Sequence, residues 1–165
     1  MLTRFVVIER NPQLRKKMRL TPFLLLYLLQ SNCKALFDDE LDLTCKGKTF
    51  RNVTLTAYFP DYTDSDHEFG YQDKRGRKLR TLQDYLDDRA EFVTLSMDDH
   101  LGIPYGTQVC IPELNKHFGH KILLEVRDSS YDLLGRGYSR ADICVRTEID
   151  SYDLNVNKFV TLVFV

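Results

Sequence analysis

Short runs of alternating apolar and polar residues recur along the chain from residue 53 onward, and this period of two predicts β-strands. The clearest run is Val53–Phe59, which is rich in β-branched and aromatic residues. Further strand-like runs cover 92–97, 106–111, 122–126, 141–145 and 159–165. Because the runs do not alternate with long helices, the pattern predicts a mainly β fold, a closed six-stranded β-barrel, rather than a layered parallel sheet.

Two short helices are predicted within this series of strands. Thr81 is a suitable cap for a helix over residues 81–86. Pro112 precedes a second helix over residues 113–118, at a position where its missing N–H does no harm, and Gly119 is a typical end signal. We therefore expect one or two short helices inserted into the barrel.

The first 35 residues differ from the rest in charge, with a balance of +6 against −7 for residues 36–165. Basic residues at 15–19 precede an apolar run, and small and polar residues follow as far as Ala35. This order is typical of a secretory signal peptide. The apolar run is too short for a membrane-spanning helix, which needs roughly 20 residues. We expect a signal peptide over 1–35, with a buried N-terminal helix as the alternative.

The remaining chain divides into a lead-in segment, 36–52, and a single domain, 53–165. Removal of the signal peptide predicts a secreted or periplasmic protein of the cell envelope, without a transmembrane span in the mature chain and monomeric. The acidic balance of residues 36–165 argues against nucleic acid as a partner, because phosphate binding requires clustered positive charge.

Three cysteines would remain in the mature chain, Cys45, Cys110 and Cys144. An exported protein meets an oxidising environment, so disulfides become possible. Cys110 and Cys144 both lie in strand-like runs, and the sequence leaves open whether they pair or are both buried thiols. None of the cysteines has the CxxC spacing of a metal or redox site.

Four short segments, in order along 53–165, resemble the motifs of one known family. They are Thr56-Ala57-Tyr58; Asp99 followed by Ile103-Pro104-Tyr105-Gly106-Thr107; Asp128-Ser129 with Gly135; and Asp142-Ile143. They are similar to the motifs of three-aspartate (3D) domains. The resemblance implies a double-psi β-barrel of the type found in MltA, expansin, barwin and RlpA-like proteins.

The resemblance also implies a function in peptidoglycan turnover. In lytic transglycosylases of the MltA type, one aspartic acid protonates the glycosidic oxygen and then deprotonates the C6 hydroxyl of the sugar, giving a 1,6-anhydro product. The matching residue here is Asp142, with Asp128 nearby. Expansin-like relatives imply an alternative, a non-catalytic barrel that binds glycan or a protein partner, because fold alone does not fix function.

The residues themselves add further expectations. Ala141 and Ile143 flank Asp142, and apolar surroundings raise the pKa of a carboxyl group toward that of a general acid. Tyr58 and Tyr138, with Tyr131, are aromatic candidates for contact with a polysaccharide.

Asp99 is either a substrate-binding residue or an acceptor of backbone N–H groups in a turn. His117 and His120 lack the accompanying ligands of a zinc site, so we expect neither a metal nor another cofactor.

Overall fold

A computed structural model describes residues 42–62 and 70–165. Leu41–Val165 make one compact unit. The predicted signal peptide, 1–35, lies outside the described residues. None of the helices in the described part of the chain is long and apolar enough to cross a membrane.

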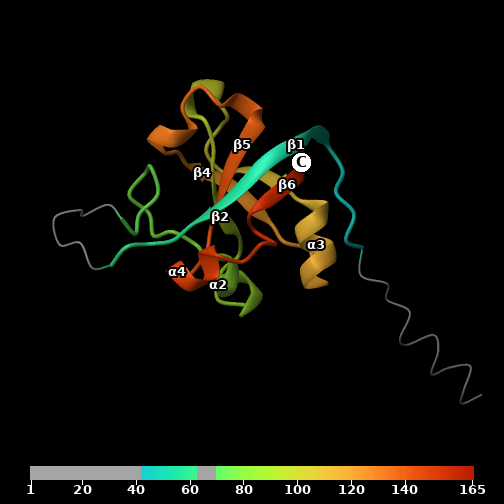
Figure 1. Ribbon diagram of the computed structural model, residues 1–165, viewed down its shortest axis with the longest axis horizontal. Coiled ribbons are helices and arrows are strands. Elements are labelled where there is room, and N and C mark those ends of the chain that lie inside the picture. The colour runs from blue at the N-terminus through green and yellow to red at the C-terminus, as the bar shows by residue number, and fades with distance from the viewer. Residues whose placement is uncertain (1–41, 63–69) are drawn as a thin grey trace, which may run out of the picture. The chain divides into compact units, whose positions relative to one another are not determined.

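The described residues form a closed, mixed β-barrel with the strand order β1-β5-β2-β4-β3-β6 (Figure 1). Two neighbouring pairs, β1 with β5 and β2 with β4, are parallel, and the other pairs are antiparallel. This confirms the predicted mainly β, six-stranded barrel, and the mixed topology is consistent with a double-psi barrel. The strands are β1 (Lys48–Tyr58), β2 (Val93–Ser96), β3 (Thr107–Cys110), β4 (Leu124–Asp128), β5 (Arg140–Cys144) and β6 (Lys158–Phe164).

Strand β1 begins five residues before the predicted run, so the end of the predicted lead-in segment belongs to the barrel. The register between β1 and β6 shifts between Phe50 and Val53. Within that shift, Asn52 adopts a positive φ of 58°, a backbone conformation that asparagine tolerates better than most residues. The resulting bulge interrupts the alternation of side chains, which is why the pattern alone marked only the second half of the strand.

Within residues 42–62 and 70–165, three short α-helices accompany the strands, where the sequence predicted one or two. They are α2 (Leu82–Leu86), α3 (Pro112–Phe118) and α4 (Glu148–Ser151). The first two confirm the prediction, with Thr81 accepting a hydrogen bond from the Asp84 amide and Gly119 ending α3 in the left-handed conformation. Helix α4 has only four residues, too few to show a repeating pattern of apolar residues in the sequence. A capping box formed by Thr147 and Asp150 begins this helix.

Alternate residues of the strands fill the barrel with aliphatic side chains. Leu55, Leu95, Leu124 and Ile143 are each fully buried in this core. Since successive strand residues point to opposite faces, the intervening side chains lie on the outer face of the barrel.

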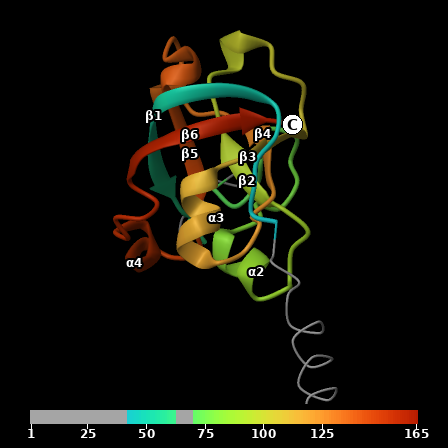
Figure 2. The same cartoon turned by 90° about the vertical axis from the view of Figure 1, so that its right-hand side faces the viewer.

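The two ends of the barrel carry different connections (Figures 1 and 2). Helices α2 and α4 lie at one end, and the loop after β2 lies at the opposite end, beside the connection between β4 and β5. A hydrogen bond of 2.8 Å from the Gly137 amide to Asp98 joins these two segments. Strand β1 runs from one end toward the other and pairs on both sides.

A disulfide joins Cys45, just before β1, to Cys110 at the end of β3. Cys144 is a buried free thiol. Cys110 therefore neither pairs with Cys144 nor remains a free thiol, which were the two alternatives that the sequence left open. The fully buried amide of Asn115 lies against both bridged sulfurs and donates a 3.0 Å hydrogen bond to the Leu43 carbonyl, so it holds the segment before β1 against α3.

Candidate functional site

A row of four polar side chains crosses four adjacent strands. Thr56 on β1 pairs with Asp142 on β5, Asp142 pairs with Ser96 on β2, and Ser96 pairs with Asp128 on β4. Because their neighbours Leu55, Leu95 and Ile143 fill the core, Thr56, Ser96 and Asp142 lie on the outer face. The register between β2 and β4 shifts just before Ser96, and this shift makes Asp128 the partner of Ser96. We call these four residues the polar row.

Asp142 is the most tightly held member of the polar row. Its residue is only 8% exposed, and the hydroxyl group of Thr56 donates a hydrogen bond to Oδ1. The Arg140 guanidinium lies 3.3 Å from the same oxygen through Nε and donates to Thr56 Oγ1 at 3.3 Å through Nη2. The Asp142 carboxyl group therefore contacts both a guanidinium group and a hydroxyl donor.

Asp128 lies in different surroundings. Burial raises the pKa of its carboxyl group, and the negative charge of Asp73 adds to the rise. The backbone N–H groups of Ser129 and Lys74 and the hydroxyl group of Tyr58 oppose the rise in pKa without cancelling it. Tyr58 donates to Asp128 Oδ2 at 3.1 Å. Burial also raises the pKa of Tyr58 well above its usual value, so Tyr58 stays a hydrogen-bond donor at neutral pH.

Ser96 lies between the two carboxylates, and sequence reasoning missed it. It is 2% exposed, and its Oγ has no hydrogen-bond partner among the described residues. A buried hydroxyl group without a partner is costly and uncommon in proteins. The signal available in the sequence was the order Thr94-Leu95-Ser96, with a polar residue on each side of an apolar one. In the structure all residues of this strand are buried.

The structure therefore brings together three of the predicted site residues, Asp142, Asp128 and Tyr58, and Asp99 is not among them. Asp99 is exposed and forms an ion pair of 2.6 Å with Lys74 Nζ. The turn acceptor considered for Asp99 is instead its neighbour Asp98, which is 4% exposed and accepts the amides of His100 and Gly137. The sequence does not distinguish these two adjacent aspartates, because the one that faces the backbone N–H groups is set by the geometry of the turn.

Tyr138 also lies apart from the polar row. Its ring stacks on Phe50 with centroids 3.8 Å apart and meets Phe164 edge-on, against the core at the start of β1. Tyr131, the other aromatic candidate, is 88% exposed.

A cavity of about 650 Å³ is formed by the segment that connects β4 to β5. Arg140 lines the cavity and also contacts Asp142 of the polar row. The cavity is lined by Tyr131, Asp132, Leu134, Gly135, Arg136 and Arg140.

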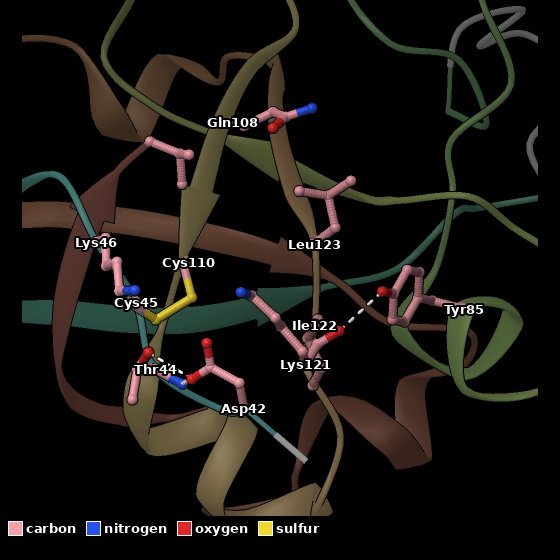
Figure 3. A pocket seen from close by; sticks show the side chains of 11 residues that line it. Asp42, Thr44, Cys45, Lys46, Tyr85, Gln108, Cys110, Lys121, Ile122 and Leu123 are labelled. Atoms are coloured by element: carbon pink, nitrogen blue, oxygen red, sulfur yellow. Dashed lines mark hydrogen bonds between the residues drawn. A yellow bond between two sulfur atoms is a disulfide. The ribbon is translucent and has the colours of Figure 1, made fainter. Parts of the chain in front are cut away.

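A second cavity, of about 510 Å³, lies beside the disulfide (Figure 3). Lys46 and Lys121 line it together with Asp42. Hydrogen bonds from Thr44, then the charges of the two lysines, lower the pKa of Asp42. Tyr85 donates a 2.8 Å hydrogen bond to the Lys121 carbonyl at the other side of this cavity (Figure 3).

Within the described ranges, His, Cys, Asp and Glu side chains form no group of three that could hold a metal ion. The chain matches no protein-family model, and no curated protein sequence matches it. The assignment of function therefore depends on the fold, the polar row and the residue motifs.

Proposed function

We propose that the protein is an exported β-barrel that acts on a cell-wall glycan, cleaving a glycosidic bond by acid/base chemistry as a peptidoglycan lytic transglycosylase does. The observation that carries the proposal is the polar row, in which two carboxyl groups lie in different surroundings. Burial raises the pKa of Asp128 and so favours its neutral form, whereas Asp142 contacts the guanidinium group of Arg140 and the hydroxyl group of Thr56. A carboxyl group with a raised pKa can act as a general acid.

These environments support an exchange of the two roles expected from the family motif. Neutral Asp128 gives its proton to the glycosidic oxygen as the C1–O bond breaks, and the resulting carboxylate takes the proton of the C6 hydroxyl as that oxygen bonds to C1. The proton balance is zero, and the product is a 1,6-anhydro sugar. The Asp142 carboxylate stabilises the positive charge that develops at C1. Tyr58 holds the Asp128 carboxyl group in place.

The disulfide supports the location. Cys45 and Cys110 are bridged, and such bonds persist mainly in secreted and periplasmic proteins. This agrees with a signal peptide over 1–35 and with a substrate in the cell wall.

Mass spectrometry of muropeptides released from purified peptidoglycan tests the proposal. The full chain should release anhydro-muropeptides, and Asp128→Asn and Asp142→Asn should each abolish the release. Asp88→Asn is a matched control, because Asp88 is exposed and has a positive φ of 56° that asparagine accepts. Reducing-end products would mean hydrolysis instead. No release by a folded protein would contradict a lytic function and favour a binding barrel.

A further inference from the structure

The chain contains one acceptor motif for N-linked glycosylation, Asn52-Val53-Thr54. Such a motif is an asparagine, then any residue except proline, then a serine or threonine. None of the other asparagines has serine or threonine two positions later: Asn11, Asn32, Asn115, Asn155 and Asn157. Because a motif of three residues also arises by chance, its place in the fold decides whether it can be used.

The two side chains that the motif requires lie on the outer face of the barrel. Val53, between them, is 1% exposed and belongs to the core, whereas Asn52 is exposed and Thr54 is half-buried. Among the residues that the structure describes, none forms a hydrogen bond with the Asn52 side chain. The side-chain amide nitrogen of Asn52 is therefore open to solvent, and the hydroxyl group of Thr54 lies on the same face.

The backbone at Asn52 leaves room for a large substituent. Asn52 lies in the bulge of β1, where the register with β6 shifts between Phe50 and Val53. Pairing between β1 and β5 begins two residues after Asn52, at Thr54. Asn52 therefore has no paired residue in either of the described strands beside β1. An oligosaccharide on its side chain extends from an unpaired position and displaces no strand neighbour.

The order of synthesis also keeps the motif accessible. Strand β1 pairs with β5 and β6, which are the last two strands along the chain. Thr56 of β1 and Asp142 of β5, which contact each other, are 86 residues apart. Because translation adds roughly 5–20 residues per second, Asn52 is synthesised several seconds before the strands that fix β1 in the barrel. During that interval a transferase meets the motif as unpaired chain.

We propose that Asn52 carries an N-linked oligosaccharide, which is transferred as the chain enters a secretory pathway. The co-reactant is an oligosaccharide bound to a lipid diphosphate. The amide nitrogen of Asn52 bonds to C1 of the first sugar and loses one proton to solvent, while the bond from C1 to the diphosphate oxygen breaks and the lipid diphosphate leaves with the electron pair. The inference rests on the exported location within the proposed function, which the Cys45–Cys110 disulfide supports, and not on glycan cleavage.

Mass spectrometry of the full chain, secreted from cultured eukaryotic cells, tests this site. The protein is measured before and after digestion with an amidase that removes N-linked oligosaccharides and converts the asparagine to aspartate. The native chain should lose the mass of one oligosaccharide, and peptide mapping should then find aspartate at position 52. Thr54→Ala should abolish the modification and Thr54→Ser should keep it. Thr161→Ala is a matched control, because Thr161 is a half-buried threonine on the neighbouring β6 and lies outside the motif.

A secreted chain of unmodified mass would overturn the site, as would an oligosaccharide that persists in Thr54→Ala. If Thr54→Ala fails to fold, Asn52→Gly replaces it, because glycine accepts the φ of 58° and has no amide to modify. A chain retained in the cytosol would contradict the export on which the modification depends. The mass needs no activity, so a modified chain without muropeptide release overturns only the lytic function, and release by a secreted, unmodified chain overturns only this site.

Discussion

Two aspartates at neighbouring strand ends, the buried Asp98 after β2 and the half-buried Asp128 at the end of β4, have pKa values shifted in opposite directions. Backbone N–H groups, first that of Gly137, lower the pKa of Asp98. Burial raises the pKa of Asp128. The difference shows that burial of a carboxyl group does not by itself indicate function: Asp98 is used to fix a loop, whereas the surroundings of Asp128 leave its charged form poorly solvated, as a general acid requires.

The largest effect expected from this comparison is on activity. Asp128→Asn removes the proposed proton donor, and general acid/base groups contribute about 10²–10⁴ in rate. We expect anhydro-muropeptide release to fall at least a hundredfold while the protein stays folded, because asparagine is close in shape to the neutral carboxyl group that burial favours. Release rates and circular dichroism measured on the same preparation check this.

Full activity in Asp128→Asn would break the comparison, since both aspartates would then be structural. Loss of activity in Asp142→Asn alone would restore the roles implied by the family motif, with Asp142 as the acid. The Asp88→Asn variant controls for the general effect of the amide.

The next largest expected effect is a loss of thermal stability when Asp98 is replaced. Asp98→Asn replaces one acceptor oxygen by an NH₂ group that faces the backbone N–H groups of His100 and Gly137. We expect Tm to fall by on the order of 5 °C. The adjacent Asp99→Asn is a matched control, because Asp99 contacts only an exposed lysine and such pairs contribute little.

Thermal unfolding of the two variants beside the native chain decides the point. A larger fall in Asp99→Asn than in Asp98→Asn would contradict the assignment of the loop clamp to Asp98.

These two aspartates also mark how far the sequence could predict the molecule. Alternation identified all six strands, because each has one face in the core and the period of two is local. Short motifs that resemble those of a known family made Asp142, Asp128 and Tyr58 candidates. The sequence could not choose between Asp98 and Asp99, since that choice depends on where the loop before β5 passes, 39 residues further along the chain.

The same limit applies to long-range partners elsewhere. Cys110 pairs with a cysteine 65 residues away, and spacing does not determine such a choice. Ser96 became a candidate only when β5 and β4 were found on its two sides. The bulge at Asn52 likewise depends on wrapping β1 around a barrel, which no local pattern encodes.

The pH dependence of stability sharpens the comparison further. Asp98 has a lowered pKa, so its contribution to stability is present above the unfolded value near 3.8 and is lost as pH falls through the folded value. Asp128 has a raised pKa, so its contribution is present below about 3.8 and is lost as pH rises through the folded value.

Tm measured at pH 3 and pH 7 tests these signs. The loss of Tm in Asp98→Asn should shrink at pH 3. The Tm of Asp128→Asn relative to that of the native chain should be higher at pH 7 than at pH 3. If both variants changed in the same direction with pH, the two aspartates would not have opposite environments.

The smallest expected effect is a change in the free energy of unfolding when Ser96, which lies between Asp142 and Asp128 in the polar row, is replaced. Its Oγ has no partner in the described residues, so Ser96→Ala removes a buried, unsatisfied hydroxyl group and should stabilise the protein by about 0.5–1 kcal/mol. Ser151→Ala is the matched control, because Ser151 Oγ donates to the Glu148 carbonyl at 2.6 Å and its loss should not stabilise. Urea unfolding measures both changes.

Muropeptide release by the same Ser96→Ala protein then shows what the hydroxyl group is for. Each neighbouring carboxyl group already has its own donors, Thr56 and Arg140 at Asp142 and Tyr58 at Asp128, so the fold does not need Ser96 to hold them. A more stable variant with release several-fold slower would mean that the hydroxyl group contacts substrate, at a cost in stability that the fold alone does not explain. A more stable variant with unchanged release would make Ser96 a neutral feature of the sheet and confine the reaction centre to the two aspartates.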